Sequence, residues 1–234
     1  MTKICLVVPH EKQPIPELRH FLTAQEADIY VFPEMFLNTE VLPEALSIMK
    51  ELNRFVVTGY RESKDGKTME KALVIDCGEI IGEYAKNITT PNEKKENRTP
   101  GDAIYCIDTR FGRIGTPICY EIHFPEVSRA MSLEKPCILF NIVGTGMYHE
   151  LQFSQWTTLA RARAIENEVW VVGCTHNNDS IPLAFAFAND GTPILCARGQ
   201  RGGFMVEVDL EKSNFKAINY EADRRPELFG ALCK

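Results

Sequence analysis

Three side chains of this sequence have the chemistry of a covalent catalyst, and each follows an apolar run. Glu34 ends VFPE, Lys86 lies in EYAKN, and Cys119 lies in RIGTPICYEIHFPE. A carboxylate, an ammonium group and a thiol can supply a base, an electrostatic stabiliser and a nucleophile. Taken singly, each is more often something ordinary, namely a solvated carboxylate, a surface lysine and a buried core thiol. The interpretation therefore depends on whether the fold brings the three together.

The opening of the chain alternates strand and helix patterns. KICLVV (3–8) and DIYVFPE (28–34) predict buried strands, and each is followed by a helical pattern, PIPELRHFLTAQEA (14–27) and LPEALSIMKELNRF (42–55). Such alternation predicts parallel strands joined by crossovers. Because α/β sheets place their sites at the C-terminal ends of the strands, we expect Glu34 at that rim.

Lys86 is expected at the end of an antiparallel segment. FVVTGYRE, KALVIDCGE and IIGEYAK follow one another between 55 and 86 with only short turns, and KDGK (64–67) is a hairpin signal. The polar stretch 87–102 has no apolar periodicity and carries two prolines, which predicts an ordered loop or a short helix.

Cys119 lies at a predicted strand–turn–helix junction. RIGTPICY (113–120) predicts a strand, and a helix is expected from about Phe124 to Leu133 with Pro125 in its first turn. Such a junction presents a side chain at the rim of the sheet and directs helix N–H groups toward it. The helix N-terminus is also expected to lower the pKa of the thiol from about 8.5.

The remaining segments predict one domain over residues 1–234, built from stacked mixed sheets with helices on the outer faces. Nothing marks a linker or an internal repeat. The further expected strands are AIYCIDT, PCILFNIV, VWVVGCTHN, LAFAFA, PILCARG and GFMVEVDL, and a longer helix is expected over 151–168.

The composition excludes several classes of protein. The 234 residues are 44% hydrophobic and 25% charged with a net charge of −6, which is ordinary for a soluble globular protein and disfavours nucleic-acid binding. No apolar run predicts a membrane span or a signal peptide, so we expect a cytoplasmic protein. The eight cysteines predict small buried hydrophobes rather than disulfides. The histidines show no metal-ligand spacing, and we expect neither a metal nor a cofactor.

The motifs, taken in order, resemble those of the nitrilase, or carbon–nitrogen hydrolase, superfamily. VFPEMF (31–36) is similar to its glutamate motif, YAKN with NEKKENRTPG (92–101) to its lysine motif, and RIGTPICYEIHFPE to its cysteine motif. QWTTLARARAIENEVWVVG (155–173) is similar to a later helix and strand, and DRRPELF (223–229) to its tail. The resemblance covers nearly the whole chain.

This resemblance implies a four-layer α-β-β-α sandwich with two mixed sheets, usually assembled as a homodimer, and we expect a homodimer or a higher homo-oligomer. It implies a catalytic triad of Glu34, Lys86 and Cys119. Many members have a second glutamate several residues after the lysine, and Glu93, at 93 − 86 = 7, is the first choice. Glu96 is the alternative.

The implied reaction is hydrolysis of a small amide to a carboxylic acid and ammonia or an amine through a cysteine thioester. Glu34 would act as the base, and Lys86 and the backbone N–H of Tyr120 would stabilise the oxyanion. A nitrile hydrolase or an N-acyltransferase could use the same cysteine. A non-catalytic protein or a redox-sensing thiol protein are alternatives from other classes.

The resemblance also suggests residues around the site. Phe36, His123 and Trp156 are expected to line the substrate pocket, and His123 stands where several similar amidases carry arginine. Glu121 is expected to be structural and to pair with a basic group. A buried hydrogen-bonded network is expected for Arg163, Glu166 and Asn167, which share a helix face.

Overall fold

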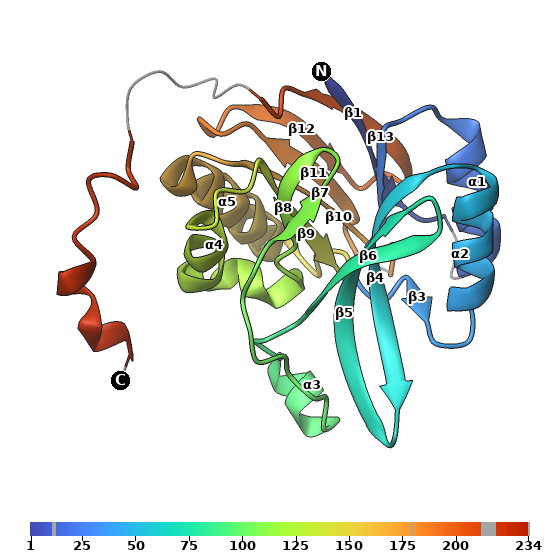
Figure 1. The fold of residues 1–234 in the computed structure, drawn as a ribbon, viewed down its shortest axis with the longest axis horizontal. Coiled ribbons are helices and arrows are strands. Elements are labelled where there is room, and N and C mark those ends of the chain that lie inside the picture. Colours follow the sequence, from blue (N-terminus) through green and yellow to red (C-terminus); the bar gives the residue numbers. More distant parts are fainter. Residues whose placement is uncertain (11–12, 179, 212–218, 234) are drawn as a thin grey trace.

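Two mixed sheets face each other between two layers of helices in the computed structural model, which describes residues 1–10, 13–178, 180–211 and 219–233 (Figure 1). The first sheet contains β1 (Thr2–Val8), β2 (Ile29–Val31), β3 (Leu37–Asn38), β4 (Phe55–Lys64), β5 (Lys67–Asp76), β6 (Glu79–Ala85) and β13 (Gly202–Val208). The second contains β7 (Ile107–Thr109), β8 (Gly112–Gly115), β9 (Ile138–Val143), β10 (Trp170–Thr175), β11 (Leu183–Phe187) and β12 (Pro193–Arg198).

The helices cover the outer faces of these sheets (Figure 1). α1 (Pro14–Ala24) and α2 (Leu42–Glu51) pack on the first sheet, and α4 (Pro125–Ser132) and α5 (Glu150–Asn167) pack on the second. The expected α-β-β-α sandwich with two mixed sheets is confirmed.

β1 is buried on both faces, which explains its continuous apolar run. Ile4, Leu6 and Val8 join the core between the two sheets, whereas Cys5 and Val7 point toward α1 and α2. This alternation follows from the two-residue period of a strand.

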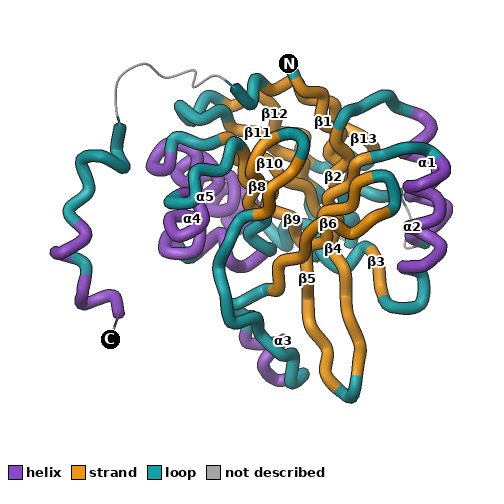
Figure 2. Tube along the Cα trace, viewed as in Figure 1, coloured by secondary structure: helices purple, strands orange, loops and turns teal. Residues whose placement is uncertain are grey.

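The pairing of the N-terminal half agrees with the sequence pattern. β1 pairs with β2, and β2 with β4, in parallel, while β4, β5 and β6 are antiparallel neighbours. The hairpin expected at KDGK joins β4 to β5, and Figure 2 shows it extending beyond the rest of the first sheet. Its two turn residues, Asp65 and Gly66, have φ of 52° and 73°, which the tight turn requires.

Several expected strands are shorter in the structure. The strand expected over 113–120 is continuous only over Gly112–Gly115, with one further parallel bridge between Ile118 and Ile142, because Pro117 has no N–H to donate and Cys119 turns away with φ of 48°. The strand expected over 103–109 pairs only from Ile107, and the backbone N–H of Cys106 donates to Glu134 Oε2 instead. The stretch before Glu34 pairs only over Ile29–Val31.

The cysteines are less uniformly buried than expected. The seven whose side chains are described are free thiols, but only Cys5 and Cys174 are fully buried. Cys196 is exposed because it lies on β12, the edge strand of the second sheet. In the described part of the chain, no helix is long and apolar enough to cross a membrane.

Candidate active site

Lys86, which directly follows β6, is buried between two carboxylates. Its Nζ lies 2.8 Å from Glu34 Oε1 and 2.7 Å from Glu93 Oε1, and its side chain is 1% exposed. Burial alone would lower the pKa of Lys86, but the negative charges of Glu34 and Glu93 outweigh it and raise the pKa. Lys86 is therefore a fixed ammonium group at neutral pH.

Glu34 reaches this position because the backbone passes very close to β4. The N–H of Gly59 donates to Pro33 O at 3.1 Å, and a Cβ on Gly59 would overlap the backbone of Glu34. Only glycine permits this approach. The next residue, Met35, has φ of 60°, so the chain turns sharply after the carboxylate.

Glu93 is oriented by a capping box at the start of the short helix α3 (Pro91–Lys95). Its backbone N–H donates to Thr90 Oγ1 at 3.2 Å, and its Oε2 accepts the N–H of Thr90 at 2.6 Å, which leaves Oε1 for Lys86. Burial would raise the pKa of Glu93, but Lys86 and the Thr90 N–H outweigh it and lower the pKa. Glu96 instead pairs with Arg98 at 2.9 Å and is 59% exposed. Glu93, not Glu96, thus contacts Lys86.

Cys119 begins the 3₁₀ helix η1 (Cys119–His123) and is partly exposed. The Glu34 carboxylate and the backbone N–H of Gly144 lie near enough to its thiol to affect the pKa of the thiol. Its φ of 48° is a strained conformation for a residue with a side chain, and such strain is common at functional sites.

The expectation that a helix N-terminus lowers the pKa of Cys119 is wrong. Burial, followed by the negative charge of Glu34, raises this pKa and outweighs the opposing effects of Lys86 and the Gly144 N–H. The reason is positional, because α4 begins at Pro125, 125 − 119 = 6 residues further on. Cys119 is therefore a thiol at neutral pH, and its reaction needs a base.

The Glu121 carboxylate accepts hydrogen bonds both from the segment before Cys119 and from residues at the end of β6. Its Oε1 accepts the Tyr84 hydroxyl at 3.0 Å and the Asn87 N–H at 2.8 Å, and its Oε2 accepts the Ile118 N–H at 2.8 Å. The expected structural role is confirmed, but the expected basic partner is wrong, since these donors are backbone N–H groups and a hydroxyl. This carboxylate links the chain around Lys86 to the chain around Cys119.

Trp156 supports the same turn through Asn141. The indole Nε1 donates to Asn141 Oδ1 at 3.0 Å, and Asn141 Nδ2 donates to Pro117 O at 3.0 Å. His123 packs edge-on against Trp156, with ring centroids 5.1 Å apart. Burial and then Arg163 lower the pKa of His123. Arg163 also forms the expected network, donating from Nε to Ile122 O and from Nη1 to Glu166 Oε1, and its carbonyl accepts Asn167 Nδ2.

A cavity of about 310 Å³ lies directly beside Glu34. Its apolar lining comprises Pro14, Met35, Phe36 and Gly144, and its polar lining comprises Arg61, His176 and Asn178. A Cβ on Gly144 would lie 2.5 Å from Glu34 Oε2, and the Gly144 N–H affects the pKa of Cys119, so both side chains lie close to a residue that lines the cavity. Phe36 lines it as expected, whereas His123 and Trp156 are not among its lining residues.

Sequence reasoning missed the polar lining of this cavity. A signal for one residue was present, because Arg61 follows the buried part of β4, which runs parallel to β2 in the same sheet. The two strands therefore end at one rim, where Glu34 also lies. His176 and Asn178 follow β10 in a polar stretch that gave no comparable signal.

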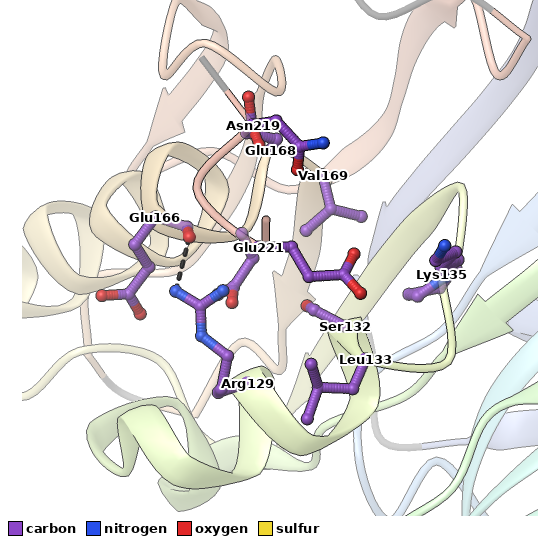
Figure 3. A pocket seen from close by; sticks show the side chains of 11 residues that line it. Arg129, Ser132, Leu133, Lys135, Glu166, Glu168, Val169, Asn219 and Glu221 are labelled. Carbon is purple, nitrogen blue, oxygen red and sulfur yellow. Dashed lines mark hydrogen bonds between the residues drawn. The ribbon is translucent and has the colours of Figure 1, made fainter. Parts of the chain in front are cut away.

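A second cavity, of about 190 Å³, lies between the ends of α4 and α5 and the C-terminal segment (Figure 3). It is lined by charged and polar side chains that include Arg129, Glu168 and Glu221, and Arg129 Nη2 donates to Glu166 O. Glu166 and Asn167 of the Arg163 network line it, but Cys119, Glu34, Lys86 and Glu93 do not. Among the described residues, no group of three or more His, Cys, Asp or Glu side chains gathers as metal ligands would.

The family model described as "Carbon-nitrogen hydrolase" matches residues 15–183. The chain belongs to this family. It is 34% identical over 152 residues to "Hydrolase C26A3.11" of Schizosaccharomyces pombe, covering 58% of this chain and 45% of that protein. It is 33% identical over 129 residues to "Omega-amidase NIT3" of Saccharomyces cerevisiae, covering 49% and 42%. The chain thus spans less than half of the length of these relatives.

The fold is that of the nitrilase superfamily. A carbon–nitrogen hydrolase from Helicobacter pylori G27 superposes with a TM-score of 0.86 at 18% identity, covering 99% of this chain and 97% of that one. An amidase mutant from Nesterenkonia sp. AN1, carrying the acetamide moiety of fluoroacetamide covalently at its active site cysteine, superposes with a TM-score of 0.79 at 17% identity, covering 98% and 95%.

Proposed function

We propose that this chain is an amidase that hydrolyses a small linear amide to a carboxylic acid and ammonia or an amine, through a thioester on Cys119. The observation that carries the proposal is that the Glu34–Lys86–Glu93 ion-pair cluster lies beside the Cys119 thiol and next to Gly144, which lines a small cavity. Relatives whose names include omega-amidase support amide hydrolysis, and the active site cysteine of the Nesterenkonia amidase, which carries the acetamide moiety of fluoroacetamide, supports a nucleophilic cysteine.

The first half of the reaction forms the thioester. Glu34, which lies beside the thiol, takes the proton as Sγ attacks the carbonyl carbon. The oxyanion would be stabilised by the Lys86 ammonium and the backbone N–H of Tyr120, which lies in the first turn of η1 where N–H groups lack helical partners. One such donor contributes about 3 kcal/mol in comparable sites. Glu34 then protonates the departing nitrogen.

The second half releases the acid. Glu34, again a carboxylate, activates a water that attacks the thioester, and the proton returns to Cys119 as the thiolate leaves. Glu93 acts through Lys86, because its carboxylate keeps the ammonium charged and directed at the reacting atoms. Residues 1–234 would act as one catalytic domain.

Ammonia release from a panel of short linear amides tests the proposal. Cys119→Ala is expected to abolish release, while Cys196→Ser, which changes an exposed thiol far along the chain, should retain it. Unchanged turnover by Cys119→Ala would refute the nucleophile. Hydroxylamine capture of the acyl group identifies acyl transfer, and turnover of nitriles but not amides would favour the nitrile hydrolase.

A further inference from the structure

Glu70 is a buried carboxylate on β5 with only one of its two oxygens paired. Its side chain is 1% exposed, and Oε1 accepts Arg61 Nε at 2.8 Å and Arg98 Nη1 at 2.9 Å. Oε2 is also buried, and it has no hydrogen-bond partner among the residues that the structure describes. Burial raises the pKa of Glu70, and the charge of Arg61 only partly offsets this. Because a buried carboxylate with an unpaired oxygen costs stability, Glu70 is a candidate for a role beyond folding.

The main chain of Glu70 holds the main chain of Lys86. β5 and β6 pair as far as Lys71 and Ala85, and one residue further the Lys86 N–H donates to the Glu70 carbonyl at 2.9 Å. On its other side, the Lys86 carbonyl accepts the N–H of Gly101 at 2.8 Å. These two bonds fix the backbone from which the Lys86 ammonium group reaches the site.

The side chain of Glu70 holds the segment that carries Glu93. The N–H of Arg98, which follows α3, donates to the Glu93 carbonyl at 2.9 Å, and the Arg98 guanidinium is 13% exposed where it meets Glu70. Beside this ion pair, the Thr99 N–H donates at 2.8 Å to the carbonyl of Thr68, which lies on the same strand as Glu70. The chain after α3 is therefore attached to β5 by one backbone hydrogen bond and one buried ion pair.

Arg61 gives the Glu70 carboxylate its orientation. The two residues are direct cross-strand neighbours on β4 and β5, which places the guanidinium beside the carboxylate without a change in the backbone. Hydrogen bonds between charged groups are stronger and more directional than neutral ones, and two of them meet at Glu70 Oε1. The carboxylate is thus held in the position from which it binds Arg98.

We propose that Glu70 is a positioning residue that sets how Lys86 meets Glu93. Its carbonyl holds the backbone of Lys86, and its carboxylate holds the segment of Glu93 through Arg98. This rests on the proposed amidase function, in which the Lys86 ammonium group stabilises the oxyanion. Lys86 Nζ lies 2.7 Å from Glu93 Oε1, and a displacement of about 1 Å near reacting groups can lower a rate by about 100-fold.

The first test measures kcat and KM for a short linear amide in the wild type, Glu70→Met and Glu62→Met. Methionine keeps the length of the side chain and removes its charge, while the backbone bond to Lys86 remains. Glu62→Met is the matched control, because Glu62 lies on the same hairpin and pairs with Lys71 at 3.1 Å, and it is in neither ion pair of Lys86.

Glu70→Met is expected to lower kcat by about 10- to 100-fold and to change KM by less than about 3-fold, because Lys86 acts on the transition state rather than on bound substrate. Glu62→Met should retain both values. A wild-type kcat in Glu70→Met, or a loss that appears only in KM, overturns the proposal. If circular dichroism shows that Glu70→Met does not fold, Arg98→Met removes the same link from its more exposed side and is held to the same expectation.

A double-mutant cycle separates positioning from a general loss of stability. In the Glu93→Gln background, Glu70→Met should lower kcat by less than about 2-fold, because the ion pair that it positions is already lost. An equal fold loss of kcat with and without Glu93 would show that Glu70 acts independently of it, and would overturn the proposal.

Hydrogen exchange of the amides in residues 91–101 gives a reading that does not depend on turnover. Peptides from this segment should exchange faster in Glu70→Met and Arg98→Met than in the wild type, and at the wild-type rate in Glu62→Met. Wild-type exchange in all three variants overturns the proposal. Failure of the wild type to hydrolyse any amide refutes the amidase function instead, and the exchange rates still show whether Glu70 holds this segment.

Discussion

Replacing Glu121 by glutamine tests whether this carboxylate holds the active site together. Both of its oxygens face donors only: Oε1 faces the Tyr84 hydroxyl and the N–H groups of Asn87 and Ile88, and Oε2 faces the N–H of Ile118. Whichever way a glutamine amide turns, its NH₂ group meets at least one buried donor.

The expected loss in the free energy of unfolding follows from these contacts. A stranded buried donor costs about 1–3 kcal/mol, and each remaining bond loses about 1 kcal/mol when its acceptor is no longer charged. Part of this is offset because a buried charge is removed. We therefore expect Glu121→Gln to lower the free energy of unfolding by about 3 kcal/mol, and Tm by about 6–12 °C for a chain of this size.

Thermal and urea unfolding followed by circular dichroism measure this change. Glu126→Gln is the matched control, because Glu126 is an exposed residue in the first turn of α4, and it should shift Tm by about 1 °C or less. The rate of Cys119 acylation in Glu121→Gln, measured well below its Tm, should also fall. A Tm equal to that of the wild type would refute the structural role.

Three further outcomes are expected. Gly144→Ala should reduce amide turnover by about 10-fold or more with little loss of Tm, because the added Cβ would press on the Glu34 carboxylate; full activity would contradict the cavity geometry. The lowered pKa of Glu93 means that its pairing with Lys86 stabilises the fold fully above its unfolded pKa of about 4.3 and less as pH falls through the folded value. In Glu93→Gln, the free energy of unfolding should therefore fall less between about pH 5 and 3 than in the wild type, and an equal fall in both would contradict this. Trp156→Phe should lower the free energy of unfolding in urea by about 1–3 kcal/mol, because the buried amide oxygen of Asn141 loses its donor; an unchanged free energy would show that this bond does not stabilise the fold.

Much of the fold could be predicted from the sequence, because strands, helices and tight turns each have a local sequence pattern. The two-residue and helical periods identified the strands and helices, and the Asp65–Gly66 turn fixed one hairpin. The lengths of strands were less accessible, since the pairing before Cys119 ends where the chain turns through a positive φ. The chain around this turn is held by contacts between residues distant in sequence, from Glu121 to Tyr84 and Asn87 and from Asn141 to Pro117.

Some residues around Cys119 were predictable from local motifs, and others were not. The sequence motifs identified Glu34, Lys86 and Cys119 as candidate catalytic residues. The spacing of Thr90 and Glu93 also matches a capping box, a signal that would have favoured Glu93 over Glu96. Gly144 and His176 depend on how the segments after different strands meet, which no local pattern encodes, whereas the place of Arg61 on β4 gave a signal. The homodimer and the cytoplasmic location stay predictions.

The most direct test of the central claim is the mass of the Cys119 peptide after acid quenching during turnover of an amide. The account predicts an added acyl group, equal to the substrate less ammonia or the amine, on the peptide that contains Cys119 and on no other cysteine. Continued turnover with no acyl group on any cysteine, or an acyl group on a different cysteine, would contradict it.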